Sequence, residues 1–168
     1  RIFRGTAFNP NPASPDLLNF WVEPRTANNT GDPSLILNHL FKVICNEDQE
    51  CYRYLINYLA DMIQQPSKKP GVMIVLMGGQ GTGKGMFFRS LRSIWQRTTL
   101  QVTNIDQVVG RFNACLERNY VVCLDEALFA GDRRATDQLK SLVTEPRISI
   151  EQKYQPPRNI DSVHRFFA

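Results

Sequence analysis

The sequence has few of the residues from which metal sites and disulfides are built. Its four cysteines form no Cys-x-x-Cys pair, and His39 and His164 are its two histidines. A zinc site of ordinary ligand spacing is therefore not expected. We expect a reducing, intracellular compartment, with Cys123 as a thiol of the core because it lies inside an apolar run. His39 lies on an apolar helical stripe, which favours a packed core histidine over a ligand.

Long apolar runs are absent as well. The longest run, at 72–77, has six residues, whereas a membrane-spanning helix needs roughly 20. No internal repeats or low-complexity tracts occur, and no charged-then-apolar leader follows Arg1. We therefore expect an internal fragment of a longer protein, with no membrane partner.

Positive charge is concentrated near the end of the chain. Residues 133–168 carry seven basic and four acidic side chains, which is most of the net charge of +4. Such a segment is either ordinary solvated surface or a surface that contacts a polyanion such as nucleic acid.

The pattern of prolines, glycines and apolar residues divides the chain at about residue 70. Residues 1–70 are expected to form an irregular segment followed by a small helical subdomain. This subdomain either helps ring assembly or packs against the sheet. Residues 71–168 alternate strands and helices, which predicts an α/β domain with a parallel sheet flanked by helices. The expected helices lie at 32–45, 48–63, about 87–95, 105–116 (broken) and 134–143, and the expected strands at 72–77, 98–102, 120–124, 148–151, 159–161 and from 166 onward.

The strongest functional signal is a glycine-rich segment that matches Gly-x-x-x-x-Gly-Lys. It follows an apolar strand and precedes an amphipathic helix, which is the context of a phosphate-binding loop. Glycines let several backbone N–H groups face one anion, and the helix adds the positive end of its dipole. Lys84 adds a full charge for the β- and γ-phosphates of ATP. The alternative is a glycine turn that binds nothing. The predicted ATP-binding residues are Gly78, Gly79, Gln80, Gly81, Thr82, Gly83, Lys84 and Gly85.

Gly85 departs from the usual pattern of such loops. A Ser or Thr normally follows the lysine and ligates Mg²⁺, and Gly85 has no hydroxyl. The ion must then depend on phosphate oxygens, waters and a carboxylate elsewhere, which Mg²⁺ tolerates. Thr82 lies within the loop and is not expected to replace the missing hydroxyl. We therefore expect slower ATP hydrolysis than in loops that have the Ser or Thr.

Two acidic residues follow the buried strand expected at 120–124. Asp125 would hold Mg²⁺, and Glu126 would orient and deprotonate the attacking water. The alternative is a pair of acids that starts the next helix. With Lys84, these two carboxylates are the predicted catalytic residues.

Several segments, in this order, resemble the helicase-like ATPase domain of phage and plasmid primase-polymerases, of the superfamily 3 type. The resemblance covers most of the chain. The segments are 19–21, 59–66, 78–85, 110–113, 121–127, 139–146 and 151–153.

This resemblance implies a P-loop NTPase core of the AAA+ type and oligomeric rings, commonly hexamers. It also implies ATP bound between subunits, translocation on single-stranded DNA, a primase or polymerase domain in the same longer chain, and the cytoplasm of a host cell. The loop with Lys84 resembles the Walker A element, and Asp125 and Glu126 resemble Walker B.

Other positions of the resemblance concern DNA. Lys140 and Lys153 lie in segments that resemble the family's B′ region, whose hairpin lysine reaches DNA in the ring channel. Tyr154, beside Lys153, offers a face on which a base stacks, although an ordinary solvated turn is the alternative.

Sensor 1 and the arginine finger are expected beyond residue 168, and nothing marks Arg158 or Arg165 as the finger. The 168 residues are therefore expected to bind nucleotide and to hydrolyse it poorly alone.

The leading function is an ATP-dependent DNA helicase or translocase module of a phage or plasmid replication protein. One alternative is a degenerate P-loop domain that serves as a platform for oligomerisation or DNA docking. Another is a P-loop small-molecule kinase. It would need a pocket for the phosphate acceptor and an arginine-bearing lid, and the sequence offers neither.

Overall fold

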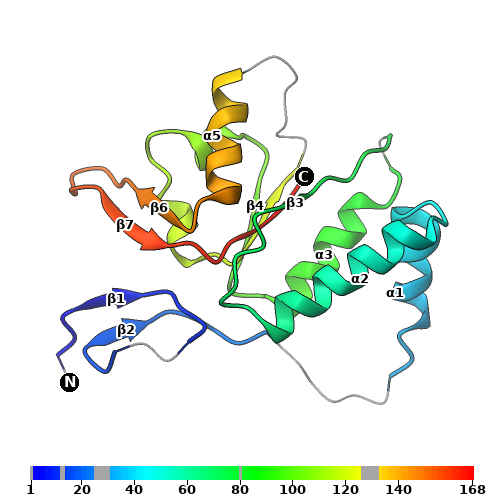
Figure 1. Cartoon of the computed structure of the whole chain (residues 1–168), viewed down its shortest axis with the longest axis horizontal. Coiled ribbons are helices and arrows are strands. Elements are labelled where there is room, and N and C mark those ends of the chain that lie inside the picture. The colour runs from blue at the N-terminus through cyan, green and yellow to red at the C-terminus, as the bar shows by residue number, and fades with distance from the viewer. Residues whose placement is uncertain (1, 12–13, 25–30, 80, 126–132) are drawn as a thin grey trace.

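A parallel four-stranded sheet forms the centre of the molecule. The structure, a computed structural model, describes residues 2–11, 14–24, 31–79, 81–125 and 133–168. All pairings in the sheet are parallel, and its strand order is β3-β8-β5-β4 (Figure 1). The prediction of an α/β fold with a parallel sheet is thereby confirmed. The strands are β3 (Met73–Ile74), β4 (Thr99–Val102), β5 (Val121–Leu124) and β8 (Arg165–Phe167).

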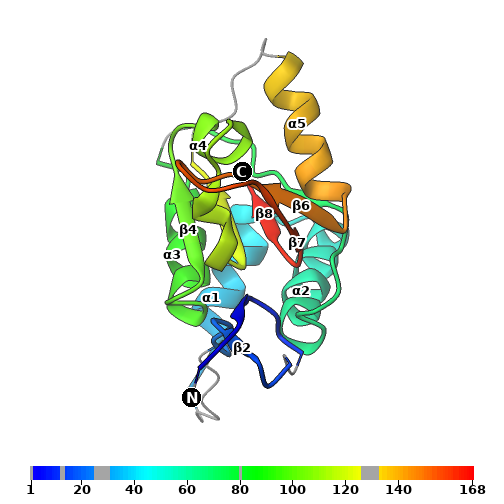
Figure 2. The ribbon, with the colours of Figure 1, turned by 90° about the vertical axis from the view of Figure 1, so that its left-hand side faces the viewer.

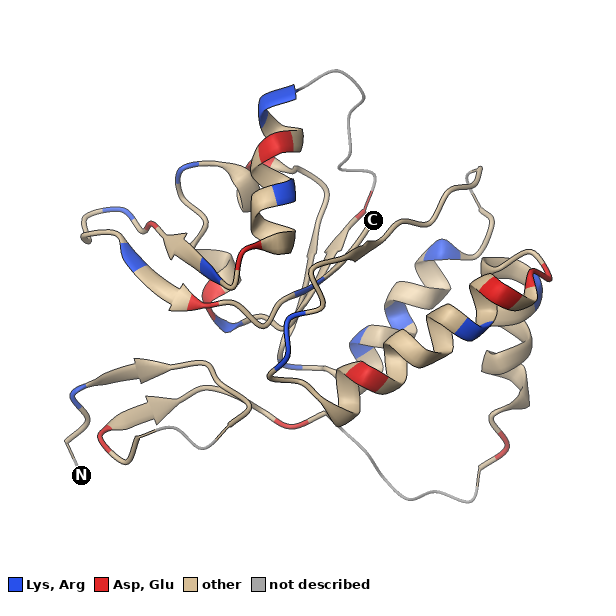
Figure 3. Ribbon diagram, in the orientation of Figure 1, with Lys and Arg blue, Asp and Glu red and all other residues tan. Residues whose placement is uncertain are grey.

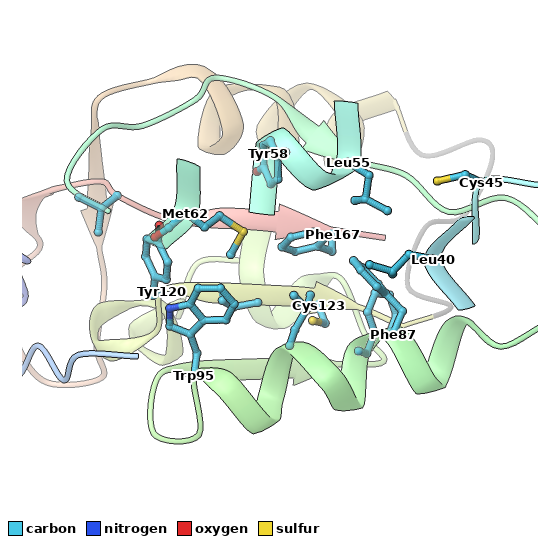
Figure 4. Packing of buried hydrophobic residues seen from close by; sticks show 14 residues of the cluster. Leu40, Cys45, Leu55, Tyr58, Met62, Phe87, Trp95, Tyr120, Cys123 and Phe167 are labelled. Atoms are coloured by element: carbon cyan, nitrogen blue, oxygen red, sulfur yellow. Dashed lines mark hydrogen bonds between the residues drawn. The ribbon is translucent and has the colours of Figure 1, made fainter. Parts of the chain in front are cut away.

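Helices and a hairpin cover the two faces of this sheet. Successive side chains of a strand point to opposite faces, so Cys123 and Phe167 belong to one core cluster, and Val122 and Phe166 to the other. Figure 4 shows Phe167 and Cys123 in the first cluster, between α2 and α3. Three helices cover the first face: η1 (His39–Ile44), α2 (Gln49–Gln64) and α3 (Lys84–Ile94). The second face is covered by α4 (Asp106–Val109), η2 (Ala114–Arg118) and α5 (Arg133–Thr144). The hairpin of β6 (Arg147–Ile150) and β7 (Arg158–Asp161) completes this second layer.

The N-terminal part is more regular than the sequence predicted. Residues 1–31 contain two short parallel strands, β1 (Gly5–Ala7) and β2 (Leu17–Asn19). They lie at the opposite end of the molecule from α5 (Figure 2). Trp21, just after β2, packs edge-on against Tyr120 with ring centroids 5.1 Å apart. This contact attaches the N-terminal segment to the base of the sheet.

The single helix expected at 32–45 is divided in the structure. Asp32 accepts the backbone N–H of Ser34 at 2.9 Å, and α1 (Ser34–Asn38) follows. The chain then widens into the π-helix η1.

The helix expected at 48–63 is confirmed as α2. It begins after Asp48, whose carboxylate accepts the N–H groups of Glu50 and Cys51. Among the described helices, none is long and apolar enough to cross a membrane.

Strand β3 is shorter and more exposed than its apolar sequence predicted. The run at 72–77 predicts a buried strand, but β3 has two residues and pairs only with β8. The strand ends at Ile74, and beyond it Val75 is half exposed and Met77 is 93% exposed. One further bond, from the Leu76 N–H to the carbonyl of Ala168 at 2.7 Å, continues the pairing toward the glycine loop.

The buried thiol and the buried histidine have clear physical roles. Cys123 is fully buried, so the prediction of a core thiol is confirmed, and burial raises its pKa to about 12. The core histidine is His164 rather than His39. Its Nε2 donates to the carbonyl of Leu116 and its Nδ1 accepts from the hydroxyl of Ser162, both at 2.9 Å. Burial lowers the pKa of His164 to about 4, so the ring is neutral in the fold.

Arg165 is fully buried at the base of β8. Its Nη1 pairs with a carboxylate oxygen of Asp61 at 3.0 Å, and its Nε donates to the Tyr120 hydroxyl at 3.0 Å. Its Nη2 donates to the carbonyls of Gln65 and Lys68. The guanidinium therefore fixes the connection between α2 and β3 to the centre of the sheet. A group held in this way does not reach a neighbouring subunit, so Arg165 is not an arginine finger.

Candidate functional site

The glycine loop lies at the carboxyl edge of the sheet. The four strands are parallel, so their carboxyl ends meet at one edge, where ligands of open α/β sheets bind. Figure 1 shows the loop between β3 and α3, with the C-terminus beside the end of β3 at the same edge. The strand–loop–helix context predicted from the sequence is therefore present.

Two glycines of the loop have backbone conformations that favour glycine. Gly81 has φ 80° and Gly83 has φ 91°. Gly83 is also closely approached, because a Cβ there would lie 2.7 Å from His39 Cε1 and 3.0 Å from Val43 Cγ1. Conformation and space therefore both exclude a side chain at position 83. Gln80 lies outside the described residues.

The side chains of Lys84 and Thr82 close the loop on itself. The Lys84 ammonium donates to the carbonyls of Gly78 at 2.5 Å and Gly79 at 2.9 Å, and the Thr82 hydroxyl donates to Gly79 at 2.8 Å. A phosphate oxygen is a stronger partner for an ammonium than a neutral carbonyl. The ammonium is thus held where an entering phosphate would compete for it. Gly85, the second residue of α3, has open space where a Cβ would stand.

The predicted metal ligand Asp125 comes directly after β5. Its Oδ2 accepts a hydrogen bond of 2.8 Å from Gln101 of β4, a residue that the sequence analysis missed. Strand β8 separates β5 from β3, so two strand spacings of about 4.8 Å each lie between the two strands that carry the site. Glu126 falls outside the described part of the chain.

The described residues fit a magnesium ion that arrives with a nucleotide. Among them, no group of three or more His, Cys, Asp or Glu residues is placed to hold a metal by itself. Mg²⁺ usually keeps several waters and binds one or two carboxylates together with substrate phosphates. Asp125, half-buried at the carboxyl edge, suits that limited role.

A second candidate region lies at the turn of the β6–β7 hairpin. Lys153 and Tyr154 are both exposed there, and Tyr154 has φ 65°. Two cationic groups lie near the half-exposed ring of Phe112: the Lys153 ammonium and the Arg111 guanidinium, each 5.6 Å from its centroid. These four residues line a groove of 440 Å³. A half-exposed aromatic ring with two cations nearby is suited to a base and its phosphates.

Asn113 holds this region together. Its side-chain amide donates to the carbonyl of Ser149 and accepts the N–H of Glu151, both at 2.9 Å. Glu151 also forms an ion pair with Arg111 at 2.9 Å. Segment 110–113 is thus attached to the end of β6, which presents Phe112 beside the hairpin turn. Sequence reasoning missed Phe112, and its only signal was an aromatic residue between Arg111 and Asn113.

The third predicted DNA-binding residue lies elsewhere. Lys140 is an exposed residue of α5 and pairs with Asp137 at 3.6 Å. It does not line the groove that contains Lys153. Figure 3 shows that basic residues are spread along α5 and the hairpin. The structure therefore brings Lys153 and Tyr154 together and leaves Lys140 on a neighbouring element.

The chain is similar to known proteins in sequence and in fold. A model of a family of unknown function, DUF5906, matches residues 76–168. The chain is 29% identical over 128 residues to the DNA primase-polymerase of Nitratiruptor phage NrS-1, an alignment that covers 72% of this chain and 17% of that protein.

Solved structures show the same fold. Two apo structures of the NrS-1 C-terminal region match 96% of this chain, with TM-scores of 0.80 and 0.73 at 22% and 23% identity. This chain covers 41% of each. The predicted similarity to phage primase-polymerases is confirmed, and the assignment to superfamily 3 stays a prediction.

Proposed function

The chain belongs to DUF5906, a family of unknown function, and from that premise we propose that it is an ATP-dependent DNA helicase or translocase module of a phage replication protein. The observation that carries the proposal is the glycine loop at the carboxyl edge of the sheet, with the Lys84 ammonium held across it. Its similarity to a phage DNA primase-polymerase supports a role in replication.

In this proposal the loop residues 78–85 bind the phosphates of ATP. Backbone N–H groups and the first turn of α3 face the anion, and Lys84 contacts the β- and γ-phosphates. Asp125 helps to hold the Mg²⁺ that comes with the nucleotide, and Glu126 activates water. Magnesium would neutralise the phosphate oxygens during transfer. The domain is thus a P-loop NTPase of the AAA+ type.

The proposed partners follow from the longer relatives. The aligned part of the chain spans 17% of the curated relative, so a primase or polymerase domain in the same protein is part of the proposal. We further propose single-stranded DNA as the track and a homo-oligomeric ring, such as a hexamer, as the assembly. Gly85 lacks the usual metal-binding hydroxyl, which favours slow hydrolysis.

Magnesium-dependent ATPase assays test this proposal. We expect the 168-residue chain to bind ATP and turn it over slowly, and the longer natural protein to hydrolyse ATP faster when single-stranded DNA is added. Hydrolysis without DNA stimulation would contradict a translocase. Nucleotide binding with no turnover by the longer protein would favour a DNA-docking platform, and acceptor-dependent phosphate transfer would favour a kinase.

The groove around Phe112 gives a separable prediction for DNA. Lys153→Ala removes one phosphate contact, so the slope of log affinity against log salt should fall by about 0.7 for a single strand. Phe112→Leu removes a stacking face, so affinity should fall about 10-fold while the salt slope stays unchanged. Binding of a fluorescent oligonucleotide at several salt concentrations measures both effects.

Lys42→Ala is the matched control for the DNA measurement. Lys42 is an exposed lysine of η1, which covers the other face of the sheet. It should change neither the affinity nor the salt slope. Equal losses in Lys42→Ala and Lys153→Ala would show that binding depends on net charge and not on the groove.

A further inference from the structure

The described residues outside the proposed nucleotide and DNA sites offer one contact that acts directly on the glycine loop. It comes from η1, in the N-terminal half of the chain. Nε2 of His39 lies 3.3 Å from the carbonyl oxygen of Gly83, 44 residues away in sequence. Because the carbonyl only accepts, Nε2 carries the hydrogen and donates it.

The contact is sterically close as well as polar. His39 Cε1 and Val43 Cγ1 occupy the space in which a Cβ of residue 83 would stand. Leu40, the next residue of η1, is buried in the core cluster that also contains Phe87 of α3. The histidine is therefore carried on an anchored element and contacts Gly83, the residue before α3. Its π-helical backbone is a conformation often found at functional sites.

The position of this hydrogen bond has a consequence for anion binding. The Gly83 carbonyl also accepts the N–H groups of Met86 at 3.0 Å and Phe87 at 3.3 Å. In a trans peptide the N–H points away from the C=O of the same unit. Three donors on the Gly83 oxygen thus fix the direction of the Lys84 N–H, which faces out of the N-terminus of α3, where a phosphate would bind.

We infer that His39 is a positioning residue for the phosphate loop, and that η1 braces the loop from outside. This inference rests on the proposed function. His39 does not touch the nucleotide; it acts through the peptide between Gly83 and Lys84. Element η1 therefore supports the nucleotide site, whereas the sequence suggested either ring assembly or plain packing for the N-terminal helices.

The test compares two variants of similar size in the full 168-residue chain. His39→Gln keeps an amide N–H near the place of Nε2, and His39→Met keeps the bulk without a donor. Affinities for ADP with Mg²⁺ and for inorganic tripolyphosphate are measured by calorimetry, and stability by urea unfolding. We expect His39→Met to weaken both ligands about 5- to 10-fold, the size of one neutral hydrogen bond, and His39→Gln to stay within about 2-fold of the wild type.

Each other outcome is decisive. Equal ligand affinities in the two variants, whatever their stabilities, would overturn the positioning role. A purely structural role of His39 would lower the stability of both variants and would not make their ligand affinities differ. A loss for ADP that tripolyphosphate does not share would place His39 on the nucleoside and also overturn it. Failure of the wild-type chain to bind either ligand would refute the proposed function itself, and the inference with it.

Discussion

Lys84→Ala should lower the affinity of the chain for ATP and Mg²⁺ by about 100-fold, because it removes a charge-assisted contact to phosphate. The ammonium now bonds the carbonyls of Gly78 and Gly79, so it is already held at the mouth of the loop. Its loss also removes most of the positive charge at the N-terminus of α3. Calorimetric titration with ATP and Mg²⁺ measures the change, and any hydrolysis by the longer protein should fall at least as much.

Lys68→Ala is the matched control for this variant. The Lys68 side chain is exposed, on the connection before β3 and away from the carboxyl edge. Both substitutions remove one positive charge, so general attraction of a polyanion falls equally in the two. Equal ATP affinities for Lys84→Ala and Lys68→Ala would contradict the phosphate-binding role of the glycine loop.

The glycine loop was predictable from the sequence because its determinants are local. An apolar strand, glycines, a lysine and an amphipathic helix follow one another within about 25 residues, and the structure has them in that order. The positive φ angles of Gly81 and Gly83 are the physical reason for glycine at those positions. The role of the loop in binding ATP stays a prediction.

The contacts that support this loop were not predictable, because they join distant segments. A histidine on an apolar stripe gives no signal that its ring rests on Gly83, 44 residues later. Gln101 likewise gains its meaning only when β4 pairs with β5 and brings it to Asp125. Asn113 was noticed as part of a resemblance, but its bonds to the end of β6 appear only in the fold.

The strand order of the sheet was not predictable from the sequence either. The sequence predicts each of its strands, yet periodicity carries no information on strand order, and β8 lies between β3 and β5. The apolar run at 72–77 predicts a strand buried on both faces, but the strand ends at Ile74 and leaves Val75 and Met77 exposed beyond it. Nothing in the sequence marks Arg165 as a buried residue, because its burial depends on partners from α2 and the connection after it.

Arg165→Met should destabilise the chain by about 3–5 kcal/mol, the usual cost of breaking a buried and hydrogen-bonded ion pair. Methionine retains much of the apolar volume of the arginine stem but none of its donors. Asp61 and the carbonyls of Gln65 and Lys68 would lose their partner. Urea unfolding followed by tryptophan fluorescence measures the loss of stability, since Trp95 lies in the core cluster of Tyr120, which Arg165 contacts.

Arg147→Met provides the comparison that isolates burial. Arg147 also pairs with an aspartate, Asp161, at 3.4 Å, but both side chains are about two-thirds exposed or more. An exposed pair contributes about 0–1 kcal/mol, so this variant should stay close to the wild type. Because Arg165 fixes the connection that leads into β3, its loss should also weaken nucleotide binding by the loop that follows this strand. Equal stability of the two variants would mean that β3 is held by its own pairing with β8 and not by the buried guanidinium.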